Sequence, residues 1–327
     1  MTGMTGMTGM TGMTGMWSMR VVRSMAIRCV GLLVLLLQPN VSQAAEIALT
    51  FDDAPMPGSS VMSGEEKTRR ILGHLRTHEV NDAVFFVTTQ HIDDAGRIRL
   101  KRYTDAGYHL AHHSHQHISA KKTAVNAYLE DFYRAHLILK EFDNVLKFHR
   151  FPYLHYGADK NARARLDEGM KELGYQNGYV TVDNFDWYIN SKLQEALDAN
   201  RAVDQQRLGQ LYVDVIWESI QFYDGIAKQV LGRSPKHVLL LHENDTSALF
   251  LGDLISKIKS EGWKIISPQL AYGDAIANEY TPDFDYNGQG RIAAIAEHKG
   301  MDKDKLRHPT ENTAALDLMF DEYRIFK

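Results

Sequence analysis

Short apolar runs alternate with longer amphipathic segments along most of the chain. A continuous apolar run of about four to eight residues indicates a buried strand, and apolar positions that recur every three or four residues indicate a helix. The expected strands are residues 46–53, 83–88, 109–113, 147–151, 178–182, 237–241 and 263–266. The expected helices are one capped by Ser63 or Gly64, followed by 94–106, 124–139, 161–173 and 248–260, and residues 190–231 are expected to be mostly helical.

Strands that alternate strictly with helices are typical of parallel strands joined by helical crossovers. Seven such units around one core predict an α/β fold, namely a distorted (β/α) barrel of seven or eight strands that need not be complete. An open, doubly wound sheet is the alternative. No glycine-rich nucleotide-binding motif follows the first expected strand, which argues against that alternative.

The N-terminal segment does not have the pattern of a folded domain. Residues 1–15 are five copies of Met-Thr-Gly, and three arginines then precede an apolar run at 29–37 and small residues at positions 42 and 44. This order is typical of a secretory signal peptide, and the apolar run is shorter than the roughly 20 residues that span a membrane. We expect residues 1–44 to be the repeat plus a cleaved signal peptide, with an uncleaved anchor as the alternative. The mature protein would then be periplasmic or extracellular, with no stable membrane insertion.

Composition narrows the function further. The chain has 327 residues, a net charge of -4 and no basic block, so nothing in it indicates nucleic-acid binding. The only cysteine, Cys29, lies in the expected signal peptide, so the mature protein would have no disulfide and no thiolate chemistry. We expect residues 45–270 to form the catalytic domain. The polar, irregular segment 271–327 is expected to be a C-terminal extension packed on the barrel.

Polar residues collect where the expected strands end. Functional residues of a parallel barrel lie at the carboxyl ends of its strands. Five of the first six expected strands end in such clusters: Asp52 and Asp53, residues 113–117, residues 150–153, residues 183–187, and residues 242–245. One polar cluster would be unremarkable in a loop, but five at strand ends predict a single functional site at that end of the barrel.

Two of these clusters contain candidate metal ligands. Adjacent side chains of a strand point to opposite sides, so one of Asp52 and Asp53 can bind a cation while the other faces substrate. If the chain turns helically after the third strand, His113 and His117 lie on one face, and with one aspartate they make a two-histidine, one-carboxylate site. An extended loop would instead group both with His115, which stays open as a ligand. Zinc is the expected metal, and cobalt, nickel or iron would fit the same ligands.

Taken in order, the motifs resemble those of a known family. They are Thr50-Phe51-Asp52-Asp53, the His-Ser-x-x-His set at 113–117, Arg150-x-Pro152-Tyr153, Asp186-Trp187 and Leu239-x-x-His242. From about residue 46 to residue 270 the chain resembles the polysaccharide deacetylase family of carbohydrate esterases. The resemblance implies a distorted (β/α) barrel and hydrolysis of acetamido or acetyl ester groups on sugars with one divalent metal.

The resemblance also implies roles for individual residues. Asp53 would join His113 and His117 as a metal ligand. Asp52 would be the general base that acts on metal-bound water, and Arg150 would hold it in place. This division agrees with elementary chemistry, because an amide carbonyl is a poor electrophile and needs a polarising cation and an activated water.

The remaining implied roles concern the leaving group and the pocket. The backbone N–H of Tyr153 would stabilise the oxyanion, and His242 would protonate the leaving amine. Asp186 would orient His242, with Asp183 as the alternative. Trp187 and Leu239 would form the wall of the pocket for the acetyl methyl group. After Tyr153 the chain departs from the family pattern, because three residues precede Gly157, and His155 could then reach the cleft.

We therefore expect a secreted, metal-dependent hydrolase that removes N-acetyl groups from an acetylated polysaccharide or oligosaccharide, such as chitin-like or peptidoglycan-like material. The same site could attack O-acetyl esters. One alternative is an amide hydrolase of a small non-sugar molecule on the same barrel. Another is a carbohydrate-binding relative without activity, which would be expected to lack Asp52, a metal histidine or His242.

Overall fold

A computed structural model of the protein describes residues 44–279 and 288–326. The chain divides into a unit of residues 1–42 and a unit of residues 43–327, and the described residues belong to the second. The expected repeat and signal peptide lie outside the described residues, apart from Ala44. Among the helices of residues 44–279 and 288–326, none is long and apolar enough to cross a membrane.

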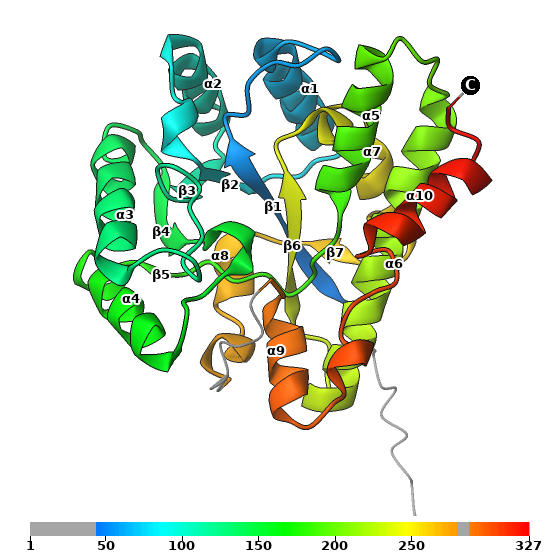
Figure 1. Cartoon of the computed structure of the whole chain (residues 1–327). Coiled ribbons are helices and arrows are strands. Elements are labelled where there is room, and N and C mark those ends of the chain that lie inside the picture. Colours follow the sequence, from blue (N-terminus) through cyan, green and yellow to red (C-terminus); the bar gives the residue numbers. More distant parts are fainter. Residues whose placement is uncertain (1–43, 280–287, 327) are drawn as a thin grey trace, which may run out of the picture. The chain divides into compact units, whose positions relative to one another are not determined.

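Parallel strands and helices alternate along the described chain (Figure 1). The strands are β1 (Glu46–Ala54), β2 (Val84–Val87), β3 (His109–His112), β4 (Val145–His149), β5 (Gln176–Asn177), β6 (Lys236–His242) and β7 (Lys264–Ile265). The α-helices are α1 (Gly64–Thr77), α2 (Asp94–Asp105), α3 (Val125–Leu139), α4 (Lys160–Glu172), α5 (Asp186–Asp198), α6 (Gln205–Leu231), α7 (Asp245–Ser260), α8 (Pro268–Tyr272), α9 (Arg291–His298) and α10 (Thr313–Glu322).

The strands form one curled sheet in the order β5-β4-β3-β2-β1-β6, and β7 pairs with the start of β1. The segment after β5 crosses from one edge of this sheet to the other. The Gly178 N–H donates to the carbonyl of His149 over 2.7 Å, and Val182 forms a parallel bridge with Leu239 of β6. The predicted distorted, incomplete (β/α) barrel is thereby confirmed, because the two edges meet through single bridges and not through a full ladder.

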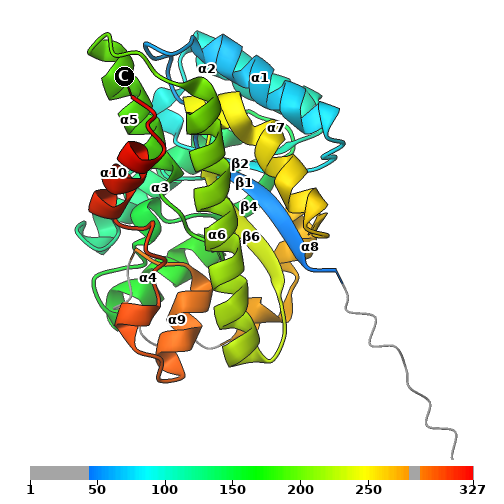
Figure 2. The ribbon, with the colours of Figure 1, turned by 90° about the vertical axis from the view of Figure 1, so that its right-hand side faces the viewer.

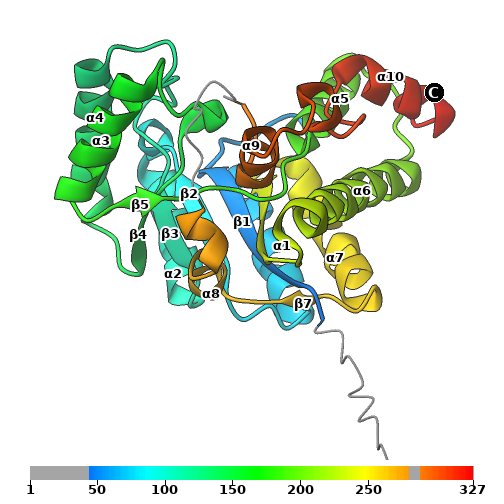
Figure 3. The ribbon, with the colours of Figure 1, turned by 90° about the horizontal axis from the view of Figure 1, so that it is seen from below.

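Strand β1 lies between β2 and β6, and its start also pairs with β7. Its residues Ile47–Phe51 are fully buried, as expected of a parallel strand that is covered on both sides. Phe51 stacks on Phe85 with ring centroids 4.9 Å apart, and Phe85 stacks on Tyr103 of α2 at 3.8 Å. Figures 2 and 3 show helices ranged around the strands, with α1, α6 and α7 next to one another.

Two local predictions were wrong. The strand expected at 178–182 does not form, because β5 already ends at Asn177 and the following residues leave β4 and turn to β6. Residues 190–231 are mostly helical as expected, in the last part of α5 and in α6, which the Asp204 carboxylate caps. The C-terminal residues 271–327 are not wholly irregular, since α9 and α10 form there and contact α6.

Candidate active site

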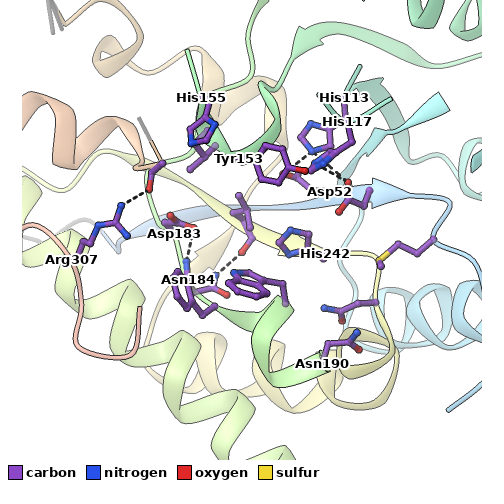
Figure 4. A pocket seen from close by; sticks show the side chains of 18 residues that line it. Asp52, His113, His117, Tyr153, His155, Asp183, Asn184, Asn190, His242 and Arg307 are labelled. Carbon is purple, nitrogen blue, oxygen red and sulfur yellow. Dashed lines mark hydrogen bonds and ion pairs between the residues drawn. The ribbon is translucent and has the colours of Figure 1, made fainter. Parts of the chain in front are cut away.

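A pocket of about 520 Å³ opens at the carboxyl ends of the barrel strands (Figure 4). The predicted site residues that line it are Asp52, Asp53, His113, His117, Tyr153, Asp183, Trp187 and His242. Two further predicted residues, Arg150 and Asp186, are fully buried behind this lining. The barrel therefore brings together side chains from five strand ends that are far apart in the sequence.

Asp53, His113 and His117 converge at one end of the pocket. Their ligand atoms all lie within 4.8 Å of one another. The Asp53 Oδ1 atom is 3.6 Å from Nε2 of His113 and 3.3 Å from Nε2 of His117. Two imidazole nitrogens and a carboxylate oxygen suit zinc and other first-row divalent metals, so the donor set fits the predicted cation.

The charge states of this group also suit a metal. Burial lowers the pKa of His113 well below its usual value, so this ring is neutral. Its Nδ1 atom bonds the carbonyl of Arg150 at 2.8 Å, which leaves Nε2 with a lone pair toward the other ligands. Burial alone would raise the pKa of Asp53, but the neighbouring His117 and His113 outweigh it and lower this pKa to about 2. A neutral imidazole and an ionised carboxylate are the forms that bind a cation.

The loop after β3 decides which histidines share the site. Ser114 has a φ of 69° and His117 a φ of 54°, so the chain turns sharply here and is not extended. The Asp131 carboxylate fixes the turn by accepting the N–H of His115 over 2.8 Å. The His115 ring turns away and bonds the hydroxyl of Thr89 at 2.8 Å. Since His115 is used there, the extended alternative in which it joins the ligands is not what the structure shows.

Non-glycine residues with positive φ gather at this site. Besides the two in the β3 loop, Asp53 has a φ of 66° and Tyr153 a φ of 58°. This left-handed conformation is unfavourable for residues with a side chain and is frequently retained where it places functional groups. At Asp53 it helps to turn the carboxylate toward the histidines, while Asp52 still follows the strand.

Asp52 is held by a fully buried arginine. The Arg150 Nη1 atom donates to Oδ1 of Asp52 over 2.6 Å, and Nε donates to the carbonyl of Gly178 over 2.8 Å. Nη2 donates to the hydroxyl of Tyr272 over 2.9 Å, and the guanidinium lies 4.0 Å from the ring centroid of Phe86. Burial raises the pKa of Asp52 to about 6 although Arg150 opposes the shift. Tyr272 lies outside every sequence motif, and no sequence pattern pointed to it.

His242 is the last residue of β6 and is the partner of Asp52 across the β1–β6 pair. Its Nδ1 atom lies 2.7 Å from Oδ1 of Asp186, and its backbone N–H donates to Oδ2 over 2.9 Å. Asn244 also donates to Oδ2, over 3.2 Å. Burial opposes protonation of the His242 ring, but Asp186, followed by Asp53 and Asp52, outweighs it and raises this pKa to about 10.

Asp186, and not Asp183, is therefore the residue that contacts His242. Asp183 accepts the N–H of Asn184 over 2.9 Å and lines the pocket. Burial, reinforced by the nearby Glu311, raises the pKa of Asp183 well above its usual value. Of the two aspartates that the sequence left open, only the one before Trp187 orients the histidine ring.

Tyr153 lies in the loop that follows β4, between the metal group and the C-terminal segment. Its backbone N–H donates no hydrogen bond within residues 44–279 and 288–326, so it is available to a ligand. Its ring packs edge-on against His117 with centroids 4.5 Å apart, and 56% of the side chain is exposed. Exposed aromatic surface also comes from Trp187 across the pocket.

The prediction that Leu239 forms the pocket wall was wrong. Leu239 is fully buried in the core, and the adjacent Leu240 lines the pocket instead. Alternate residues of a strand share a face, so the residue on the same side as His242 lies two positions before it and not three. The sequence already indicated this, because Leu239 and His242 are an odd number of positions apart and so lie on opposite faces of the strand.

The sequence also missed several residues that line the pocket. His155, which the sequence left open, does reach it. Met56, from the loop after β1, and Asn190, from α5, belong to no motif, whereas Asn244 lies in the predicted 242–245 cluster. The residues Gly288 and Arg307 come from the C-terminal segment, which the sequence pattern assigned no part in the site.

Comparisons with known proteins agree with this geometry. A sequence model of the polysaccharide deacetylase family matches residues 40–178. The peptidoglycan-N-acetylglucosamine deacetylase PgdA of Listeria monocytogenes serotype 1/2a is 24% identical over 241 residues, which are 73% of this chain. The chain covers 41% of the length of that relative. Over these residues the chain is similar to the polysaccharide deacetylase family.

Solved structures show a distant likeness. A peptidoglycan deacetylase PdaC from Bacillus subtilis aligns with a TM-score of 0.46 and 20% identity over 70% of this chain and 90% of that chain. A family 4 carbohydrate esterase from Streptomyces lividans in complex with acetate aligns with a TM-score of 0.46 and 19% identity over 69% of this chain and 95% of that chain.

Proposed function

We propose that this protein is a metal-dependent hydrolase that removes N-acetyl groups from an acetylated glycan outside the cytoplasm. The observation that carries the proposal is the meeting of three groups in one pocket: the Asp53–His113–His117 set, the Asp52–Arg150 pair and the His242–Asp186 pair. Each supplies one requirement of amide hydrolysis. The match of residues 40–178 to the polysaccharide deacetylase model supports the substrate class, and the expected signal peptide supports the location.

Asp53, His113 and His117 would hold the divalent cation, with zinc expected before cobalt, nickel or iron. A cation bound there polarises the acetyl carbonyl and makes water easier to deprotonate. Asp52 then takes the proton of the attacking water as general base. Its carboxylate cannot turn away, because Arg150 holds Oδ1 while Oδ2 stays on the side of His113, 3.7 Å from Nε2.

The leaving amine needs a proton, and His242 is placed to donate it from Nε2. Asp186 accepts from Nδ1, which fixes the tautomer and favours the charged ring. The free N–H of Tyr153 supplies a donor for the oxyanion that forms on the acetyl carbonyl. The ring of Trp187 and the side chain of Leu240 offer the apolar wall for the acetyl methyl group.

The test is acetate release from a panel of N-acetylated glycans by protein that begins at Ala45. The protein would be stripped with chelator and then given zinc or cobalt, beside an Asp52→Asn variant. We expect release that depends on the restored metal and falls by about 10²- to 10⁴-fold in the variant. If folded protein with bound metal releases no acetate from any glycan, the proposal is wrong and a small amide becomes the better candidate. Release from acetyl esters alone would make it an O-acetyl esterase.

A further inference from the structure

The pocket is not uniform in charge from one end to the other. Figure 4 shows Asp52 and His113 at one end and Arg307 at the other, with Asp183 and Asn184 between them. The first end collects carboxylates and histidines. At the other end the charged side chain exposed in the lining is the guanidinium of Arg307. A substrate that fills the pocket therefore meets a metal group and a separate cation.

The C-terminal segment places Arg307 against the loop after β4. The Gly288 N–H donates to the carbonyl of Leu154 over 3.0 Å, and Nη2 of Arg307 donates to the carbonyl of Gly288 over 3.1 Å. Gly288 has a φ of 81°, and a Cβ there would lie 3.6 Å from Nη2 of Arg307 and 4.0 Å from Nε2 of His155. Arg307 and His155 thus both lie close to Gly288, which has no side chain, at the pocket wall.

Arg307 keeps donors free for a ligand. Within the described residues it forms no ion pair, and its hydrogen bond to Gly288 uses one of five N–H groups. The charge of Arg307 acts on two carboxyl groups, Glu311 and Asp183, to which it makes no ion pair within the described residues. Glu311 accepts from the hydroxyl of Tyr223 over 2.5 Å and from the side chain of Gln289 over 2.9 Å. Asp183 is buried, and its raised pKa favours the neutral form.

Two further cations, Lys121 and Lys122, lie near His155 at the Arg307 end of the pocket. The Ser119 hydroxyl bonds Nδ1 of His155 at 2.8 Å, and the Lys122 N–H donates to the carbonyl of Ser119 over 3.1 Å. Lys121 and Lys122 are exposed, and neither forms an ion pair in the part of the chain that the structure describes. After burial, their charges are what lower the pKa of His155. Lys121 and Lys122 therefore act on His155, and Arg307 lies close to Gly288, as His155 does.

We propose that Arg307, supported by Lys121 and Lys122, forms a subsite for a carboxylate on a sugar next to the one that loses its acetyl group. The substrate would then be an acetylated glycan that also carries carboxylates, either as a lactyl ether or as a uronic acid. A planar guanidinium binds a carboxylate through two parallel hydrogen bonds, and exposed lysines attract it from a distance. This proposal rests on the proposed function and adds the charge of the substrate to it.

The test compares three tetrasaccharides of equal length built on N-acetylglucosamine: one neutral, one with lactyl ethers and one with uronic acids. The quantity measured is the ratio of kcat/KM on each acidic glycan to kcat/KM on the neutral one. We expect one acidic glycan to be preferred, and Arg307→Gln to lower its ratio about tenfold, as for one charge-assisted pair. Arg307→Lys should recover part of the loss. Arg165→Gln, which removes a solvent-exposed arginine from α4, is the matched control and should keep the ratio.

The results separate two failures. Equal ratios in wild-type protein and Arg307→Gln would overturn the subsite, as would an equal loss on neutral and acidic glycans, which indicates a disturbed Gly288 contact. If no glycan releases acetate, calorimetric binding of the acidic tetrasaccharides replaces the kinetic ratio. Binding that weakens about tenfold in Arg307→Gln would then support the subsite although the proposed activity fails. Binding that is unchanged would overturn the subsite too.

Discussion

Replacement of Arg150 by lysine tests how the proposed general base is held. The guanidinium reaches Asp52, Gly178 and Tyr272 from three different nitrogens, over 2.6, 2.8 and 2.9 Å. A single lysine ammonium can keep the contact with Asp52. It cannot also reach Gly178 and Tyr272, which accept from the other two nitrogens of the guanidinium. Two buried acceptors would then lose a charged donor. At about 1–3 kcal/mol for each, the expected loss is roughly 2–6 kcal/mol in the free energy of unfolding.

Two assays measure this change. A loss near 4 kcal/mol corresponds to a fall of about 8–16 °C in Tm for a domain of this size. Because the Asp52 carboxylate is no longer fixed, we also expect kcat for acetate release to fall about 10²-fold, with a smaller change in KM. The control is Arg102→Lys, since Arg102 pairs with Glu65 in an exposed position and should lose less than about 1 kcal/mol.

An Arg150→Lys protein with Tm within about 2 °C of wild type and unchanged kcat would refute the reasoning. It would show that the four contacts of the buried guanidinium neither stabilise the barrel nor hold the base. A fall in Tm with unchanged kcat would separate the two claims. Arg150 would then be structural, and Asp52 would be oriented by another group.

Three further predictions follow from contacts at single residues. Asp186→Asn should lower kcat about 10²- to 10⁴-fold, because an amide cannot accept at both positions that bond His242, and the alkaline limb of the pH–rate profile should move to lower pH. Leu239→Ala should cost about 2–5 kcal/mol in urea unfolding, while Leu240→Ala should cost less and admit propionamide substrates. Burial acts to raise the pKa of Asp224, but hydrogen bonds from His237 and Lys228 outweigh burial and lower this pKa to about 2. Its folded pKa is below the unfolded value, so the Tm deficit of Asp224→Asn should be complete above about pH 4 and vanish as the pH falls through 2.

The barrel could be predicted from the sequence because its strands are continuous apolar runs that end in polar clusters. The same rule placed both aspartates, His113 and His117 at one end of the barrel, and the family resemblance implied that Asp53 is the carboxylate ligand. It could not choose between His113–His117 and a set with His115, since that depends on the turn at Ser114. Local periodicity carries no information on such turns when the residue with positive φ is not glycine.

Errors in the predicted site have two physical sources. Leu239 was chosen by motif spacing without regard to the face of the strand, although parity favours Leu240. Tyr272 and Arg307 reach the site from segments with no motif, and their contacts join positions far apart in the chain. A single sequence does not show which distant loop will cover the open side of a barrel. Residues supplied by such loops are therefore found only in the folded chain.

The pairing of β1 with β6 makes activity depend on the end of folding. Asp52 and His242 are cross-strand partners, yet most of the barrel sequence separates them. Contacts between distant positions close large loops, and they form late in folding compared with local helices. A chain that has emerged only as far as β5 would contain the metal ligands and Arg150 but not the proposed acid. The proposed base and acid would therefore come together only when the whole barrel has been synthesised and closed, so regained turnover during refolding would report closure of the barrel and not its collapse.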